Sequence, residues 1–264
     1  MQPFNQGHLM LQFDVASLPP EDGQRDLVIS ANAVIRMLYQ IKVTTVPRLD
    51  PETSARLSSV VRIYIQSNLR RLIMFLEGGL HEHEQKRALF TITAARSMYE
   101  SIASFHDFSA QICKLLDQNE FKEAANLLRG RAFATRLPEH LELGQSNEVE
   151  NEVARADGFP VSLSWFKDTY NRMSEFVHPN TYGSLVQFHS RSRDGQNTTF
   201  YDNGKPTNDG LTYLISASLL SVLFLADVAQ IENRLEDYSL AKVPMQVLLW
   251  ADSSIVLNIC EQRK

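Results

Sequence analysis

Apolar residues recur at steps of three and four along most of this 264-residue chain, which is the spacing of one face of an α-helix. The clearest stretch opens at Asp50-Pro51-Glu52, where a capping Asp precedes a Pro at the first helical position. We expect this helix to close at Gly78-Gly79, because glycine supplies the φ freedom of a C-terminal cap. The same spacing predicts further helices over residues 26–41, 84–116, 120–136, 160–177, 208–235 and 243–261.

Polar and turn-rich segments interrupt the helical pattern. Residues 1–25 read as an irregular lead-in, and residues 137–158 read as a polar, acidic loop. Two short β-prone runs flank the turn Arg193-Asp194-Gly195-Gln196, which predicts a small hairpin. We therefore predict an all-α fold, with one domain over residues 26–264. It should be a helical bundle of five to seven helices with a β-hairpin inserted near residues 184–202.

The segment Leu211–Ala226 carries no charged residue, which raises the question of a membrane span. It has only sixteen residues, contains Thr212 and three serines, and is followed by Asp227. A spanning helix needs about 20 apolar residues. A helix that is apolar all round is otherwise buried in a protein core. We therefore expect a central core helix and no membrane insertion.

Composition places the chain among ordinary globular proteins, with 44% hydrophobic and 22% charged residues. The chain does not open with a charged segment followed by an apolar run, so we expect no secretion signal and a cytoplasmic location. Cys113 and Cys260 lie in apolar helical segments and are predicted to be buried thiols in a reducing compartment. The net charge of −5 argues against a general nucleic-acid binder, although it allows a local basic patch.

The stretch most informative about function is Tyr170–Asn180, which reads YNRMSEFVHPN. Pro179 disfavours helical geometry in the residue before it, so the helix should end near Val177 with His178 at its C-terminal edge. The unpaired carbonyls at that edge favour an imidazolium, and so does Glu175 one turn back. His178 is therefore a candidate for a group that titrates near neutral pH.

Two interpretations of this cluster stay open. In the functional one, His178 would handle the 2′-hydroxyl proton of RNA, and Arg172 would stabilise charge on the phosphate. In the structural one, His178 caps helix carbonyls and bonds to Glu175, while Arg172 lies on the surface. The residue types at this spacing, taken alone, favour the structural interpretation.

The sequence YxxMSExxHP at residues 170–179 resembles the Y-x-x-L-S-E-x-x-H signature of a family of bacterial helical domains of unknown function. That family is similar to the HEPN domains (higher eukaryote and prokaryote nucleotide-binding). The segment RSMYE at residues 96–100 resembles the same family's R-x-x-x-E helix. HEPN ribonucleases carry an Arg, then a polar residue, then a His. Arg172 and His178 match the outer two, whereas Met173 stands where the polar residue is expected.

The resemblance extends loosely over residues 55–235 and implies a bacterial protein of the defence or toxin type. It implies RNA cleavage without a metal or other cofactor, and it places Arg96 and Glu100 one turn apart on a helix packed near the Tyr170 helix. It further implies a homodimer and a cognate antitoxin or other partner protein. The alternative is a non-catalytic helical binding or interaction module that uses the same polar cluster. The candidate catalytic residues are His178, Arg172 and Glu175, and the supporting polar network comprises Arg96, Glu100, Ser174, Tyr170 and Asn180.

Other polar motifs have simpler interpretations. His81-Glu82-His83-Glu84 lacks the H-E-x-x-H spacing of zinc hydrolases and reads as a solvated helix start. His106 is predicted to be an ordinary core or surface histidine, with a role beside Arg96 and Glu100 as the alternative. The chain has no Gly-rich phosphate loop and no Cys pair at metal spacing, so we predict no metal site.

A basic stretch at residues 121–136 contains Lys122, Arg129, Arg131 and Arg136 beside two phenylalanines. The spacing indicates the solvated face of an amphipathic helix. If the chain is a ribonuclease, this face is the natural one to approach RNA.

Overall fold

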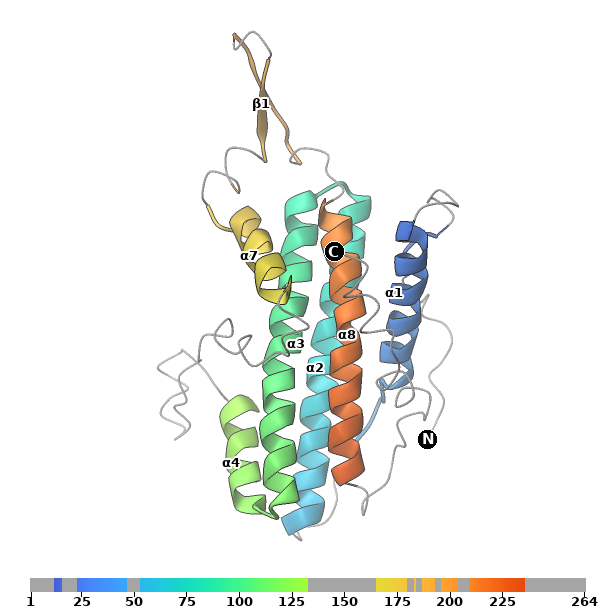
Figure 1. The fold of residues 1–264 in the computed structure, drawn as a ribbon, viewed down its shortest axis with the longest axis vertical. Coiled ribbons are helices and arrows are strands. Elements are labelled where there is room, and N and C mark those ends of the chain that lie inside the picture. Colours follow the sequence, from blue (N-terminus) through green and yellow to red (C-terminus); the bar gives the residue numbers. More distant parts are fainter. Residues whose placement is uncertain are drawn as a thin grey trace.

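The computed structural model describes residues 12–15, 23–46, 53–132, 165–179, 183, 187–192, 196–203 and 209–235. Within these ranges the chain forms six α-helices and one two-stranded antiparallel sheet, which confirms the predicted all-α bundle with a small hairpin (Figure 1). The elements in chain order are α1 (Gly23–Gln40), α2 (Thr53–Glu84), α3 (Ala88–Asp117), α4 (Phe121–Ala132), α7 (Trp165–Val177), β1 (His189–Arg191), β2 (Thr198–Phe200) and α8 (Asp209–Arg234).

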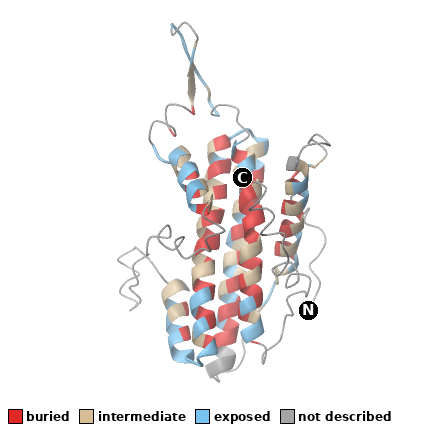
Figure 2. Cartoon of the chain, in the orientation of Figure 1, coloured by how far each residue is buried: buried red, intermediate tan, exposed pale blue. Residues whose placement is uncertain are grey.

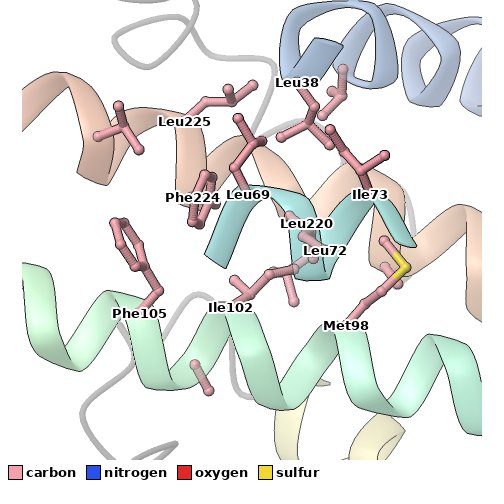
Figure 3. Packing of buried hydrophobic residues seen from close by; sticks show 14 of the residues in the cluster. Leu38, Leu69, Leu72, Ile73, Met98, Ile102, Phe105, Leu220, Phe224 and Leu225 are labelled. Carbon is pink, nitrogen blue, oxygen red and sulfur yellow. The ribbon is translucent and has the colours of Figure 1, made fainter. Parts of the chain in front are cut away.

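Three long helices, α2, α3 and α8, run side by side and form the body of the bundle (Figure 1). The helix α1 packs against α8, while α7 and α4 pack against opposite ends of α3. Buried residues line the sides on which these helices meet (Figure 2). At their centre Leu72, Ile102 and Phe224 belong to one apolar cluster (Figure 3), and the ring centroids of Phe105 and Phe224 are 4.3 Å apart. This core sets the relative positions of the helices that carry the candidate site.

The helix α2 does not end at Gly78-Gly79, so the predicted cap is wrong. Gly79 is buried, and a Cβ added there would lie 2.9 Å from a Leu214 methyl and 3.0 Å from the Ala94 Cβ. The missing side chain thus allows a close approach of α2 to α3 and α8. A Cβ added at Gly78 would meet nothing within 4 Å. Gly79 is therefore needed for the close packing of three helices, and not for a positive φ.

The actual end of α2 is a turn centred on Lys86, which has a φ of 58°. The Lys86 N–H donates to the His83 carbonyl and the Arg87 N–H donates to the Glu82 carbonyl, both at 2.9 Å. This pair of bonds is a Schellman motif, in which the left-handed position is usually glycine. The next helix, α3, consequently begins at Ala88, four residues later than the spacing predicted.

The segment His81–Glu84 forms the last turn of α2, which corrects its interpretation as a helix start. His81 and His83 are the basic residues of that turn, where a positive charge interacts favourably with the helix dipole. Both wrong predictions have one cause, because each depends on a helix that ends at Gly78-Gly79.

The helix α8 is the predicted core helix of the bundle. Among the described residues it is the one helix long and apolar enough to cross a membrane by length and composition, and 72% of its most apolar window is buried inside the protein. Its Ser218 and Ser221 hydroxyls donate to the Leu214 and Ala217 carbonyls at 2.8 and 3.0 Å. These bonds satisfy the hydroxyls within the helix, so the serines fit an apolar core.

The predicted hairpin is also confirmed. The strands β1 and β2 pair with Ser190 opposite Thr199, and the ribbon projects beyond the α7 end of the bundle (Figure 1). Phe200 is 76% exposed on this ribbon.

Several predictions concern residues outside the described ranges. They are most of the lead-in over residues 1–25, the helix start at Asp50-Pro51-Glu52, Arg136, the loop over 137–158, Asn180, the turn residues 193–195, the helix over 243–261 and Cys260. Cys113, which is described, is a buried free thiol as predicted.

Candidate functional site

The helix α7 carries most of the predicted cluster. Its buried residues are Phe166, Tyr170 and Met173, which are spaced by four and three positions and therefore lie on one face. That face packs on α3, where the Phe166 and Tyr99 rings stack with centroids 5.0 Å apart. The helix ends at Val177, as Pro179 predicted, and its polar residues are left on the opposite face.

A three-residue polar network joins α7 to α3. Arg96 Nη2 donates to the Tyr170 hydroxyl at 2.9 Å, and that hydroxyl donates to Glu100 Oε1 at 2.8 Å. Arg96 Nη2 also lies 3.0 Å from Glu100 Oε1, one turn further along α3. The Arg96 guanidinium carbon is 5.2 Å from the centre of the Tyr170 ring, within the range of a cation–π contact. The expectation that Arg96 and Glu100 lie one turn apart beside the Tyr170 helix is therefore confirmed.

Partial burial shapes the chemistry of this network. Burial raises the pKa of the Tyr170 phenol, while the hydrogen bond from Arg96 lowers it and the bond to Glu100 raises it again. The phenol thus stays protonated and can donate to the carboxylate. Since the Arg96 and Glu100 side chains are only 21% and 25% exposed, their pairing also offsets the cost of partial burial. The network therefore fixes α7 on α3.

The three candidate catalytic residues lie on the outer side of α7. Arg172, Glu175 and His178 are all exposed. Ser174 donates to the Tyr170 carbonyl at 2.9 Å, which keeps its hydroxyl on its own helix. The structure therefore places the polar network between α7 and α3 and leaves the candidate catalytic groups exposed on the outer side of α7.

The charge of Arg172 also affects Tyr213, which lies near the beginning of α8. Burial raises the pKa of the Tyr213 phenol, Asp209 raises it further, and Arg172 opposes both. The Phe176 and Tyr213 rings are in edge contact, with centroids 6.4 Å apart. The outer face of α7 is therefore continuous with the first turns of α8.

The chain returns against the end of α7 at Gly183. A Cβ on this buried glycine would lie 2.0 Å from the His178 carbonyl oxygen and 2.7 Å from that of Phe176. Only glycine allows this approach of backbone to backbone. The carbonyl end of α7 is thus covered by the chain, while His178 itself is exposed.

The sequence did not predict a second polar bridge, between α3 and α8. His106 Nδ1 lies 2.9 Å from Asp227 Oδ2, and the Asp227 side chain is only 5% exposed. His106 is thus engaged with Asp227, six residues and about 9 Å along α3 from Glu100. A signal was present, because Asp227 directly follows the uncharged segment of α8 and a buried acid requires a partner.

One residue of the basic stretch of α4 also forms an ion pair with α3. Arg131 forms an ion pair with Asp107 of α3, and its side chain is 12% exposed. Lys122 and Arg129 are exposed, as expected for the solvated face of an amphipathic helix. This arrangement ties α4 to the half of α3 that α7 does not cover.

No group of three or more His, Cys, Asp or Glu side chains that could hold a metal ion occurs among the described residues. No known protein family, curated protein or solved structure matches the chain.

Proposed function

We propose that the chain is an HEPN-like bacterial protein of the defence or toxin type, which cleaves RNA without a metal ion at the C-terminal end of α7. One observation carries the proposal: α7 exposes Arg172, Glu175 and His178 while its opposite face is fixed to α3. A polymer can reach only exposed groups, and catalytic groups act best from a rigid element. The α7 end meets both conditions.

In the proposed reaction His178 acts as the base and Arg172 as the phosphate ligand. The neutral imidazole takes the proton of an RNA 2′-hydroxyl, and the 2′-oxygen attacks the adjacent phosphorus. The bond from phosphorus to the 5′-oxygen breaks, and the leaving oxygen takes a proton from solvent. The products are a 2′,3′-cyclic phosphate and a 5′-hydroxyl end. Arg172 stabilises the charge on the phosphate oxygens, and Glu175 stabilises the imidazolium.

The Arg96–Glu100–Tyr170 network has a positioning role in this scheme. It contacts α7 at Tyr170, about two turns before His178, and holds the helix in one orientation on α3. None of its three members needs to touch RNA. A change in the network should therefore alter the reaction through the placement of α7.

The test is incubation of the purified protein with mixed RNA in excess EDTA. The parent should produce 2′,3′-cyclic phosphate ends, and His178→Ala should lower the rate by at least about 100-fold, the usual contribution of a general base. His81→Ala is the matched control, because His81 is also exposed but lies on α2. Equal cleavage by all three proteins would reveal a contaminating nuclease and contradict the proposal.

A second candidate is a non-catalytic module that binds a partner protein or a nucleotide through the same face. Two observations favour it. Met173, which stands at the polar position of HEPN ribonucleases, is fully buried. The hydroxyl of Tyr170 is already engaged by both Arg96 and Glu100. In this case RNA or protein would bind and be released unchanged. His178→Ala would weaken binding, and neither the parent nor the variant would cleave RNA.

Oligomeric state separates two forms of the main proposal. The family resemblance implies a homodimer whose two copies form the site together, and a cognate antitoxin or other partner protein that covers it. Sedimentation at the concentration of the cleavage assay should then show a dimer. An active monomer would contradict the shared site while leaving the roles of Arg172 and His178 intact.

A further inference from the structure

The second polar bridge, between α3 and α8, lies apart from the proposed site and joins the two helices within the bundle. His106 Nδ1 lies 3.1 Å from Asp227 Oδ1 and 2.9 Å from Oδ2, so one ring nitrogen faces both carboxylate oxygens. The Asp227 side chain is 5% exposed and that of His106 is 27% exposed. A carboxylate at this depth is stable only with a donor beside it.

Several other charged groups of the described residues lie near the pair, and most of these form ion pairs with each other. On α3, Asp107 lies next to His106 and also acts on it electrostatically. The Cys113 thiol, also on α3, interacts electrostatically with both Asp227 and Arg234. Three ion pairs involve the surrounding helices. Arg62 of α2 pairs with Glu232 of α8, Arg131 of α4 pairs with Asp107, and Arg234 of α8 pairs with Asp117. Among the described charged side chains at this end, His106 is thus the one that both contacts Asp227 and changes charge near neutral pH.

We propose that the His106–Asp227 pair is a pH-responsive lock between α3 and α8, closed while the imidazole carries its proton and weakened when the proton leaves. With the proton, the pair is a charge-assisted bond that compensates the buried carboxylate. Without it, the carboxylate keeps its charge in a buried position and faces a neutral ring. The uncompensated buried charge then destabilises the packing of α3 against α8.

The direction of the pH effect follows from both partners. The hydrogen bond to Asp227 raises the pKa of His106 above its ordinary 6.5, against the opposing effect of burial. Burial raises the pKa of the Asp227 carboxyl, against the opposing effect of His106. Both groups therefore hold protons more tightly in the folded chain than in the unfolded one. The stability contributed by His106 is complete below pH 6.5 and is lost as the pH rises through its higher folded pKa.

Burial also raises the pKa of the Cys113 thiol above its ordinary value of 9.0. Its titration therefore falls above the pH range in which the imidazole loses its proton. Measurements below pH 8.5 report on the histidine pair without this thiol.

The test is urea unfolding of the parent, His106→Gln and Asp227→Asn at several pH values from 5.5 to 8.5. The unfolding midpoint of the parent should fall as the pH rises above 6.5, and both variants should lose most of this fall. His81→Gln, which removes an exposed histidine, should keep the parent's pH dependence. Identical pH dependence in the parent and both lock variants would overturn the proposal.

A second measurement covers the case in which a lock variant does not fold. The His106 ring protons of the parent are followed by NMR as the pH changes. The proposal requires a titration midpoint above 6.5, and a midpoint at or below 6.5 would overturn it. The lock is independent of the proposed ribonuclease activity, so either can fail without the other.

Discussion

The helix α3 forms two polar bridges that differ in depth and in chemistry. In its first half, Arg96 and Glu100 hold α7 through Tyr170, with side chains about one-quarter exposed. In its second half, His106 holds α8 through Asp227, whose side chain is 5% exposed. The first bridge uses an arginine that stays charged over the whole accessible pH range. The second uses a histidine that changes charge near neutrality.

This difference separates the positioning of a surface from the stability of the core. The α7 bridge supports an exposed face, and its loss should mainly change how that face is presented. The α8 bridge lies where α3 meets a core helix, so its loss should mainly change the free energy of unfolding. Substitutions in each bridge can test this division.

Removal of the α8 bridge should have the largest effect on stability. At pH 5.5, where the imidazole carries its proton, His106→Ala removes the charge-assisted bond to Asp227 and should lower the free energy of unfolding by about 3 kcal/mol. At pH 8 the loss should be smaller, because the bond is already weakened in the parent once the imidazole, whose pKa Asp227 raises, loses its proton. Chemical denaturation at both pH values measures the difference. An equal loss at both would show that packing, not charge, is what the substitution removes.

The two adjacent glycines of α2 test the packing on which both bridges depend. Alanine at Gly78 meets no neighbour and should stabilise the helix by about 1 kcal/mol. Alanine at Gly79 gains the same helix propensity, but its Cβ lies 2.9 Å from Leu214. Gly79→Ala should therefore be less stable than Gly78→Ala by about 1 kcal/mol or more. Thermal unfolding of both variants checks this, and equal stability would mean that α2 and α8 can separate without cost.

The α7 bridge should contribute less to stability. Tyr170→Phe removes the hydroxyl shared by Arg96 and Glu100 but leaves their ion pair, so the expected loss is about 1 kcal/mol. Tyr213→Phe is the control, since its half-buried hydroxyl makes no hydrogen bond to another described residue. If Tyr170→Phe also lowers RNA cleavage without changing the reaction's pH dependence, the network positions α7. A shifted pH profile would instead indicate that the phenol takes part in proton transfer.

The exposed candidates should have the smallest effect on stability. Arg172→Ala and His178→Ala remove side chains on the outer side of α7 and should each change the free energy of unfolding by less than about 0.5 kcal/mol. Denaturation of the two variants beside the parent measures this. A loss as large as that of His106→Ala would assign His178 a structural role.

Spacing alone predicted much of the fold. The positions of α1, α7, α8 and the hairpin follow from apolar periodicity and turn residues, because each element buries one face in the expected way. The end of α2 did not follow, because Gly79 serves a contact with α3 and α8 that lies far away in the sequence. A local rule that assigns glycine to helix ends cannot detect such a contact.

The candidate site shows the same division. The placement of Arg96 and Glu100 beside the Tyr170 helix was implied by the resemblance of two short motifs to a helical family, and periodicity alone did not relate the two helices. The His106–Asp227 pair joins positions 121 residues apart, and no local pattern relates them. The uncharged run before Asp227 indicated only that a partner was needed, not which residue would supply it.

The two histidines of this comparison provide the most direct test of the proposed function. Initial rates of RNA cleavage in EDTA are measured at pH 6, where the lock is closed, for the parent, His178→Ala and His106→Gln. His178→Ala should lose at least about 100-fold in rate, and His106→Gln should keep a rate close to the parent's. Retention of the parent's rate by His178→Ala, or absence of cleavage by the parent itself, would contradict the proposed function.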